Sequence, residues 1–152
     1  MASIVLGVND GLIELTGALV GFTFVLEKHN LVALTGLITG IAAALSMAAS
    51  AFMQARHEHE KNPVQAAFTT GISYLIVVLF LVAPYFIFEN ALAALPVMFG
   101  IALAIIAVIS YYNSIYLKQS FWREFGIMFI FSIGVAAVSY GIGSGFRSFL
   151  GI

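Results

Sequence analysis

The sequence contains few charged residues. Only 9% of its 152 residues are Asp, Glu, Lys or Arg, whereas 62% are hydrophobic. A soluble domain carries roughly a quarter charged residues, because its surface faces water. This chain cannot cover such a surface, which indicates that most of its surroundings are lipid.

Several functional classes are disfavoured by what is absent. The chain has no cysteine, which excludes disulfides, thiolate metal sites and thiol catalysis. The net charge is −1 and there is no basic stretch, which argues against a nucleic-acid partner. Neither GVNDG nor GIGSG matches a phosphate-binding loop, and no hydrolytic or redox site is recognisable. We therefore predict a protein that is not an enzyme and binds no cofactor.

Five apolar runs are long enough to span a bilayer, which takes about 20 residues. They are residues 4–26, 31–54, 64–88, 92–117 and 125–149. Polar stretches at 27–30, 55–63, 89–90 and 118–124 separate them. Asn62 and Pro63 suit the start of a helix, as its N-cap and first residue. The sequence predicts one all-α, polytopic transmembrane domain over residues 1–152. Residues 1–26 are not expected to be a signal peptide, because no basic region precedes them and acidic residues interrupt the run.

Basic residues set the expected orientation. Arg56, Lys61, Lys118 and Arg123 fall on one side of the five spans, whereas Lys28 and Arg147 fall on the other. Because cytoplasmic loops carry the excess of Lys and Arg, we predict a cytoplasmic N-terminus and a C-terminus on the opposite side.

Small residues recur at the spacing that lets helices pack closely. The pairs are Gly17/Gly21, Gly36/Gly40 and Gly141/Gly145. Packing within a helix bundle is the expected role of all three.

Two carboxylates lie inside the first apolar run, in the stretch GVNDGLIELTG. Asp10 and Glu14 share one helix face, about 6 Å apart along the axis. Glu14 would lie about 15 Å deep, near the middle of the hydrocarbon core. Carboxylates at such depth usually mark an ion or proton path, because burying their charge is costly. The alternative is that Asp10 caps an interfacial turn and Glu14 is a neutral, hydrogen-bonded core group.

The second run supplies a further ligand type at matching depth. Met47 would lie roughly 10 Å from the cytoplasmic end of its helix, and Asp10 roughly 9 Å from that of the first. Carboxylate oxygens suit Mn²⁺, whereas a thioether favours softer ions, so the combination points towards Fe²⁺. The predicted metal ligands are Asp10, Glu14 and Met47. Secondary candidates are Asn9, Ser46, Ser50, Met53 and His57.

These residues carry a family resemblance. GVNDGLIELTGALVGFTFVL and LTGLITGIAAALSMAAS resemble the VIT1/CCC1 family of vacuolar-type iron and manganese transporters, as do NPVQAAFTTGISYLIVVLFLVAPY and GVAAVSYGIG. The resemblance implies a five-span homodimer that exports cytoplasmic Fe²⁺, or a similar metal, in exchange for protons. It also implies an ion path along the first two helices at the dimer interface, with Asp10 and Met47 as path-lining residues.

The chain departs from the family pattern at three places. Thr39 and Ala51 stand where many members carry a glutamate, and Glu14 could supply the second carboxylate instead. Between spans two and three, most members insert a cytoplasmic metal-collecting domain, whereas this chain has only ARHEHEKNP. The histidines there are expected to form a solvated cap on the second helix, with weak metal capture as the alternative.

Two other functions remain open at this point. Glu14 could exchange protons for an organic cation, which aromatic neighbours would favour. The chain could instead be a non-transporting membrane scaffold or assembly subunit that retains the fold.

Overall fold

The computed structural model describes residues 2–26, 28–116 and 118–150. Within these ranges all regular structure is helical: α1 (Ala2–Val25), α2 (His29–His57), α3 (Pro63–Ile87), α4 (Ala91–Tyr116) and α5 (Phe121–Leu150). All five are long and apolar enough to cross a membrane. The predicted all-α, five-span architecture is therefore confirmed for the described part of the chain.

The helix bounds agree with the predicted spans to within two residues except at two places. The fifth helix was predicted from residue 125 but begins at Phe121, where the Ser120 carbonyl accepts the backbone N–H groups of Arg123 and Glu124. The second helix continues to His57 rather than ending at residue 54. Both helices extend beyond their apolar stretches, so bounds taken from apolar runs alone make them too short. The predicted end of the fourth span, residue 117, lies outside the described residues.

The connections are as short as the sequence indicates. Residues 58–62 join α2 to α3, with Asn62 at the N-cap position and Pro63 as the first residue of α3. Pro84 and Pro96 lie inside α3 and α4. No inserted domain separates α2 from α3.

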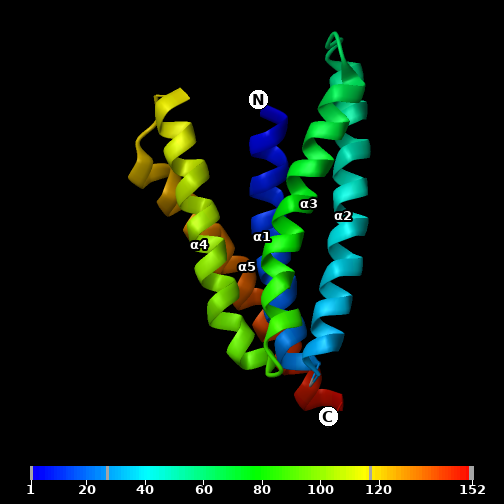
Figure 1. The fold of residues 1–152 in the computed structure, drawn as a ribbon, viewed down its shortest axis with the longest axis vertical. Helices are drawn as coiled ribbons and strands as arrows, with labels where there is room; N and C mark the ends of the chain where they lie inside the picture. The colour runs from blue at the N-terminus through cyan, green and yellow to red at the C-terminus, as the bar shows by residue number, and fades with distance from the viewer. Residues whose placement is uncertain (1, 27, 117, 151–152) are drawn as a thin grey trace.

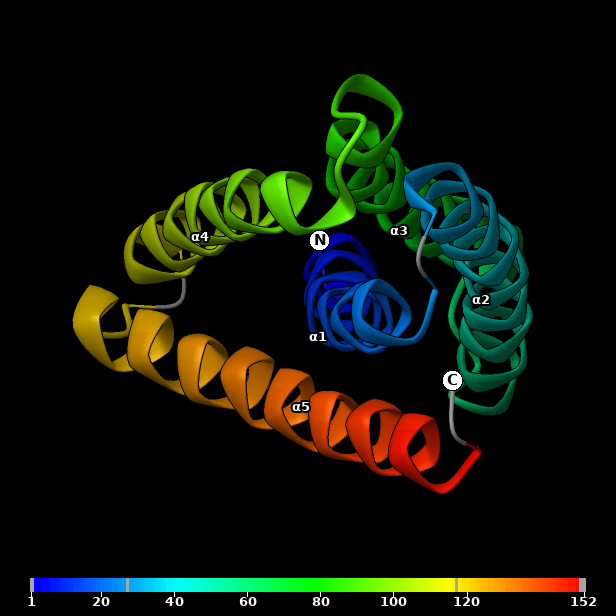
Figure 2. The same ribbon diagram turned by 90° about the horizontal axis from the view of Figure 1, so that it is seen from below.

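The first helix occupies the centre of the bundle. In the view along the helices, α4, α3, α2 and α5 are arranged around α1 (Figure 2). The main neighbours of α1 are α3 and α5, whereas α2 packs chiefly on α3. Consecutive helices run antiparallel, with the N-terminus and the α2–α3 and α4–α5 connections at one end (Figure 1). The chain therefore places its acidic helix between the others.

Glycines allow these close approaches, as predicted for two of the three pairs. A Cβ on Gly40 would lie 2.5 Å from Cγ1 of Val78, and one on Gly36 would lie 2.6 Å from Cδ2 of Leu19. Gly17 and Gly21 face Val135 and Ser139 of α5. The prediction is wrong for Gly141 and Gly145, because a Cβ on either would meet no described atom within 4 Å. Gly143, between them, is the α5 glycine that contacts Gly21.

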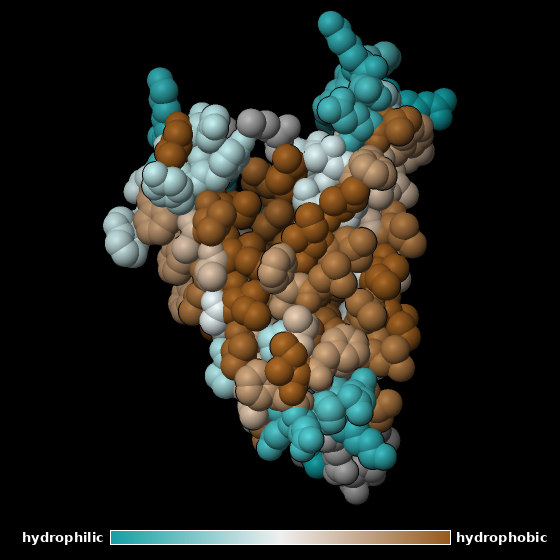
Figure 3. Space-filling view, in the orientation of Figure 1, coloured by the Kyte–Doolittle hydropathy of each residue, from teal (hydrophilic) through white to brown (hydrophobic). Residues whose placement is uncertain are grey.

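Apolar and polar residues are distributed over the surface as in a membrane protein. On the face shown in Figure 3, a broad apolar band covers the middle of the bundle, and polar residues gather at its two ends. Large apolar side chains such as Phe68, Leu79 and Ile130 are exposed within the helices. These side chains need not be buried inside the bundle, because the lipid around it is as apolar as they are.

Candidate ion site on the central helix

The two acidic residues of α1 lie one turn apart, with different exposure. Asp10 is half-buried, whereas Glu14 is exposed on the surface of the chain. Glu14 is nevertheless near the middle of a 24-residue apolar helix. Asp10 and Glu14 are close enough to interact electrostatically. Two such carboxylates can both stay charged in an apolar setting only if a cation lies between them; otherwise they share a proton.

Tyr74 of α3 is a member of this site that the sequence did not reveal. Its hydroxyl donates a hydrogen bond to Oε2 of Glu14 across 2.7 Å, and its side chain is fully buried. Asp10 also interacts electrostatically with Tyr74. A tyrosine in an apolar run gives no signal of its partner 60 residues away, so the sequence pattern could not identify this contact.

Glycines on α1 make that hydrogen bond possible. A Cβ on Gly7 would overlap the carbonyl oxygen of Thr70, so the backbones of α1 and α3 are in contact there. One turn further on, Gly11 faces Val77 and the ring of Tyr74 at ordinary van der Waals distances. The side chain of Tyr74 therefore passes along the glycine face of α1 to reach Glu14.

Met47 lies at a depth similar to that of Asp10. Ala48, beside it, contacts Gly71 of α3, and Gly7 contacts Thr70 at the same level. Asp10 is three residues beyond Gly7, or about 4.5 Å along the axis. Met47 is half-buried and packs against the hydrophobic core. Its role as a metal ligand stays a prediction.

The secondary candidates are dispersed. Ser46 and Ser50 are exposed on α2, Met53 is half exposed and His57 is the last residue of that helix. His57 belongs to a polar helix end in which the Gln54 side chain donates to Oε1 of Glu58. Asn9 is half-buried, and its Oδ1 atom has no partner among the described residues.

A single chain does not assemble a full set of charged ligands. Among residues 2–26, 28–116 and 118–150, no group of three or more His, Cys, Asp or Glu side chains could hold a metal ion together. Asp10 and Glu14 are the acidic residues of α1, and no third His, Cys, Asp or Glu side chain of the described part of the chain completes a metal site with them.

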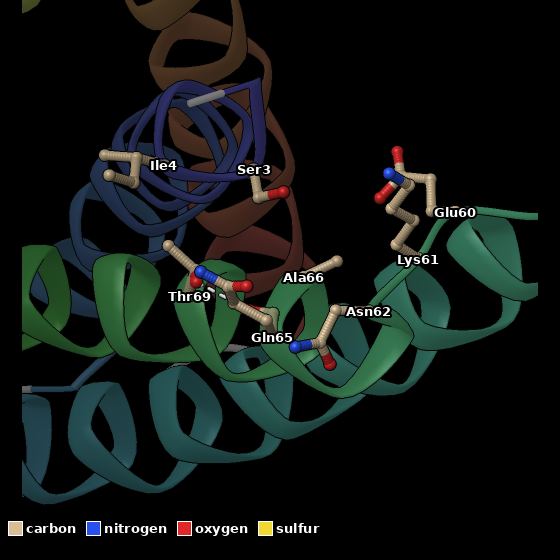
Figure 4. A pocket seen from close by; sticks show the side chains of 8 residues that line it. All are labelled: Ser3, Ile4, Glu60, Lys61, Asn62, Gln65, Ala66 and Thr69. Atoms are coloured by element: carbon tan, nitrogen blue, oxygen red, sulfur yellow. Dashed lines mark hydrogen bonds between the residues drawn. The ribbon is translucent and has the colours of Figure 1, made fainter.

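Pockets lie at both ends of α1. At the polar end, a pocket of about 460 Å³ lies between the start of α1, the α2–α3 connection and the start of α3. Its polar lining includes Ser3, Glu60, Gln65 and Thr69 (Figure 4). At the opposite end, a pocket of about 420 Å³ between α1, α2 and α5 is lined by apolar and small residues. The Glu14–Tyr74 contact lies between these two levels.

The fold and the acidic central helix define a polytopic membrane protein with an intramembrane polar site. The model of the VIT family matches residues 1–62 and 53–144, so the chain belongs to this family. Membership indicates a membrane metal transporter. The two matched segments overlap in residues 53–62, around the short α2–α3 connection. No curated protein matches the chain.

Proposed function

We propose that the protein carries a divalent metal ion, Fe²⁺ or Mn²⁺, out of the cytoplasm in exchange for protons. Family membership supports the class of metal transporter. The observation that carries the finer proposal is the pair Asp10 and Glu14, one turn apart on the central helix and bonded to α3 through Tyr74.

The ligand chemistry supports these metals. The oxygens of Asp10 and Glu14 suit Mn²⁺, and the thioether of Met47 would favour the softer Fe²⁺. The same carboxylate oxygens bind either protons or a cation. Protonation from the far side of the membrane would therefore release the metal, and metal binding on the cytoplasmic side would release the protons.

The exposure of Glu14 supports a homodimer. A carboxylate at mid-span would face hydrocarbon in a single chain, at a cost of several kcal/mol. A second copy packed over α1 and α2 would remove Glu14 from lipid and contribute the ligands that one chain lacks. The ion path would then lie along α1 and α2 at the dimer interface, with the N-terminus cytoplasmic.

Metal flux into proteoliposomes under an imposed pH gradient tests the proposal. The parent would be compared with Asp10→Asn, Glu14→Gln and Met47→Leu, using Fe²⁺ and Mn²⁺. Glu89→Gln is a matched control, because Glu89 is exposed in the α3–α4 turn. We expect saturable, gradient-dependent flux that is lost in the Asp10 and Glu14 variants and retained in the control.

Two results would show whether Met47 is a metal ligand and whether the protein transports metal at all. A larger effect of Met47→Leu on Fe²⁺ than on Mn²⁺ identifies the thioether as a ligand. Absence of metal flux from folded parent protein, in either orientation, rejects the metal-transporter proposal and leaves the organic-cation exporter and the scaffold.

An organic cation is the second candidate substrate. Tyr74 provides one aromatic side chain beside Glu14, which is the type of neighbour that such a substrate favours. Efflux of quaternary ammonium compounds that requires Glu14 and does not respond to Fe²⁺ or Mn²⁺ would select this candidate.

A further inference from the structure

An apolar cavity lies between α1, α4 and α5, on the opposite side of α1 from Glu14. Its volume is about 240 Å³, and its lining includes Thr16, Ala102 and Ile106. The surface of the cavity is apolar, and the oxygen of Thr16 is itself buried. Thr16 follows Glu14 by two residues, which places it about 200° further round α1. A second copy packed over Glu14 would therefore leave this cavity uncovered.

The cavity opens between α4 and α5 on the outside of the bundle. Leu103, Phe129 and Ile133 line it and are 38%, 38% and 42% exposed. Ala102 and Ile106 also line it and are buried. The exposed residues therefore form the mouth of the cavity, and the buried ones form its floor. An unfilled cavity of this kind loses dispersion contacts, and the apolar groups that a bilayer supplies to its mouth are acyl chains.

An indented face of α5 leads from this mouth to the α4–α5 connection. It is formed by Trp122, Gly126, Phe129 and Ile133, which recur at intervals of four, three and four residues and so share one side of the helix. A Cβ on Gly126 would meet no described atom within 4 Å, so the space over this glycine is open. The connected ends of α4 and α5 lie away from α1 (Figure 2). The indentation therefore continues the cavity towards the end of the bundle.

Two basic side chains and an aromatic ring lie where the indented face reaches that end. Lys118 and Arg123 are exposed, and neither forms an ion pair within the part of the chain that the structure describes. The neighbouring Glu124 is half-buried, and its Oε2 accepts a hydrogen bond from the side chain of Asn113. Trp122 is 78% exposed, and rings of this type collect at the level of the lipid headgroups. The exposed charges of the α4–α5 connection are therefore positive.

The spacing along α5 matches the dimensions of a phospholipid. Phe129 and Ile133 follow Arg123 by six and ten residues, which is about 9 and 15 Å along the helix axis. The hydrocarbon of one leaflet is about 15 Å thick, half of the bilayer core. A headgroup at Arg123 therefore places the acyl chains of the same lipid at the mouth of the cavity.

We propose that an anionic phospholipid binds between α4 and α5, with its headgroup at Lys118 and Arg123 and one acyl chain in the cavity behind Phe129. Basic sites between membrane helices select anionic headgroups, whereas the apolar cavity accepts the chain of any phospholipid. The bound lipid fills the space that α1 leaves between α4 and α5 and holds these two helices together. This site does not depend on the proposed metal transport, because it lies on the other side of α1 from Glu14.

Native mass spectrometry of the full protein tests the headgroup site, using micelles that contain phosphatidylglycerol or phosphatidylcholine. We expect the protein to retain phosphatidylglycerol preferentially. Lys118→Gln and Arg123→Gln should each weaken its binding about fivefold, which is the contribution of one basic residue near an anionic surface. Lys61→Gln is the matched control, because Lys61 is exposed at the same end of the bundle in the α2–α3 connection. Equal retention of the two lipids, or equal effects of Lys61→Gln and Arg123→Gln, would overturn the proposal.

Photo-crosslinking tests the acyl-chain site, using phosphatidylglycerol with a diazirine on its chain and mapping the adducts by mass spectrometry. We expect adducts at Ile133 that excess phosphatidylglycerol displaces and phosphatidylcholine does not, whereas both lipids should displace adducts at Phe68, which is exposed on α3. Leu103→Trp narrows the mouth and should abolish the selective adduct, and Val108→Trp, exposed on α4 outside the cavity, should keep it. Circular dichroism checks the folding of both variants, and the parent pattern decides alone if Leu103→Trp does not fold. Identical displacement at Ile133 and Phe68 would refute the site.

Discussion

Replacing Gly7 by alanine tests the central contact between α1 and α3. The added methyl group would overlap the carbonyl oxygen of Thr70 and lie 3.2 Å from Cβ of Ser73. A backbone carbonyl inside a helix cannot rotate away as a flexible side chain can. The helices must therefore separate, which displaces Asp10 on one side and Tyr74 on the other.

Two opposing contributions determine how much Gly7→Ala changes the free energy of unfolding. Overpacking of a close contact costs about 1–3 kcal/mol. Alanine in place of glycine stabilises a helix interior by about 0.5–1 kcal/mol. Gly100→Ala is the matched control, because a Cβ on Gly100 meets no described atom within 4 Å. Relative to this control, Gly7→Ala should lose about 1–3 kcal/mol of unfolding free energy.

Reversible unfolding in mixed micelles, followed by circular dichroism, measures this difference. Metal flux should fall in Gly7→Ala as well, because the Glu14–Tyr74 hydrogen bond depends on the approach of the two helices. Equal stability of Gly7→Ala and Gly100→Ala would refute the close α1–α3 contact and the positioning of the site that depends on it.

Three further changes address the site, the polar helix end and the orientation. Tyr74→Phe removes the donor to the Glu14 carboxylate and should cost about 1–2 kcal/mol of unfolding free energy, with reduced metal flux. Combined His57→Gln and His59→Gln should leave saturable flux unchanged, because both side chains are exposed at the end of α2; a raised half-saturation concentration for metal would instead indicate capture. Since the chain lacks cysteine, Lys61→Cys and Glu89→Cys can be labelled singly in cells, and only the latter should react with an impermeant maleimide from outside the cytoplasm.

Apolar run lengths and their polar interruptions were enough to predict the five helices. The start of α5 was missed because residues 121–124 include Arg123 and Glu124, which ended the apolar run. A helix does not have to end where the hydrocarbon core ends, since its backbone hydrogen bonds are internal. Arg123 and Glu124 therefore belong to the first turn of α5.

Partners across the bundle were harder to predict than the helices themselves. Helical spacing indicated that Asp10 and Glu14 share a face, but it could not show that Tyr74 joins them from α3. That contact depends on how α3 packs against α1, and the local sequence has no recognisable pattern for this packing.

The structure also bears on the two positions where the family resemblance implies glutamates. Ala51 is buried, one turn from Ala48, which packs against Gly71 of α3. In this chain, a carboxylate at Ala51 would therefore point between α2 and α3, away from the exposed side of Glu14. A carboxylate on α1, bonded to Tyr74, avoids that crowded interface. This arrangement supports our proposal that Glu14 supplies the second acidic ligand, and it predicts that Ala51→Glu cannot restore flux to Glu14→Gln.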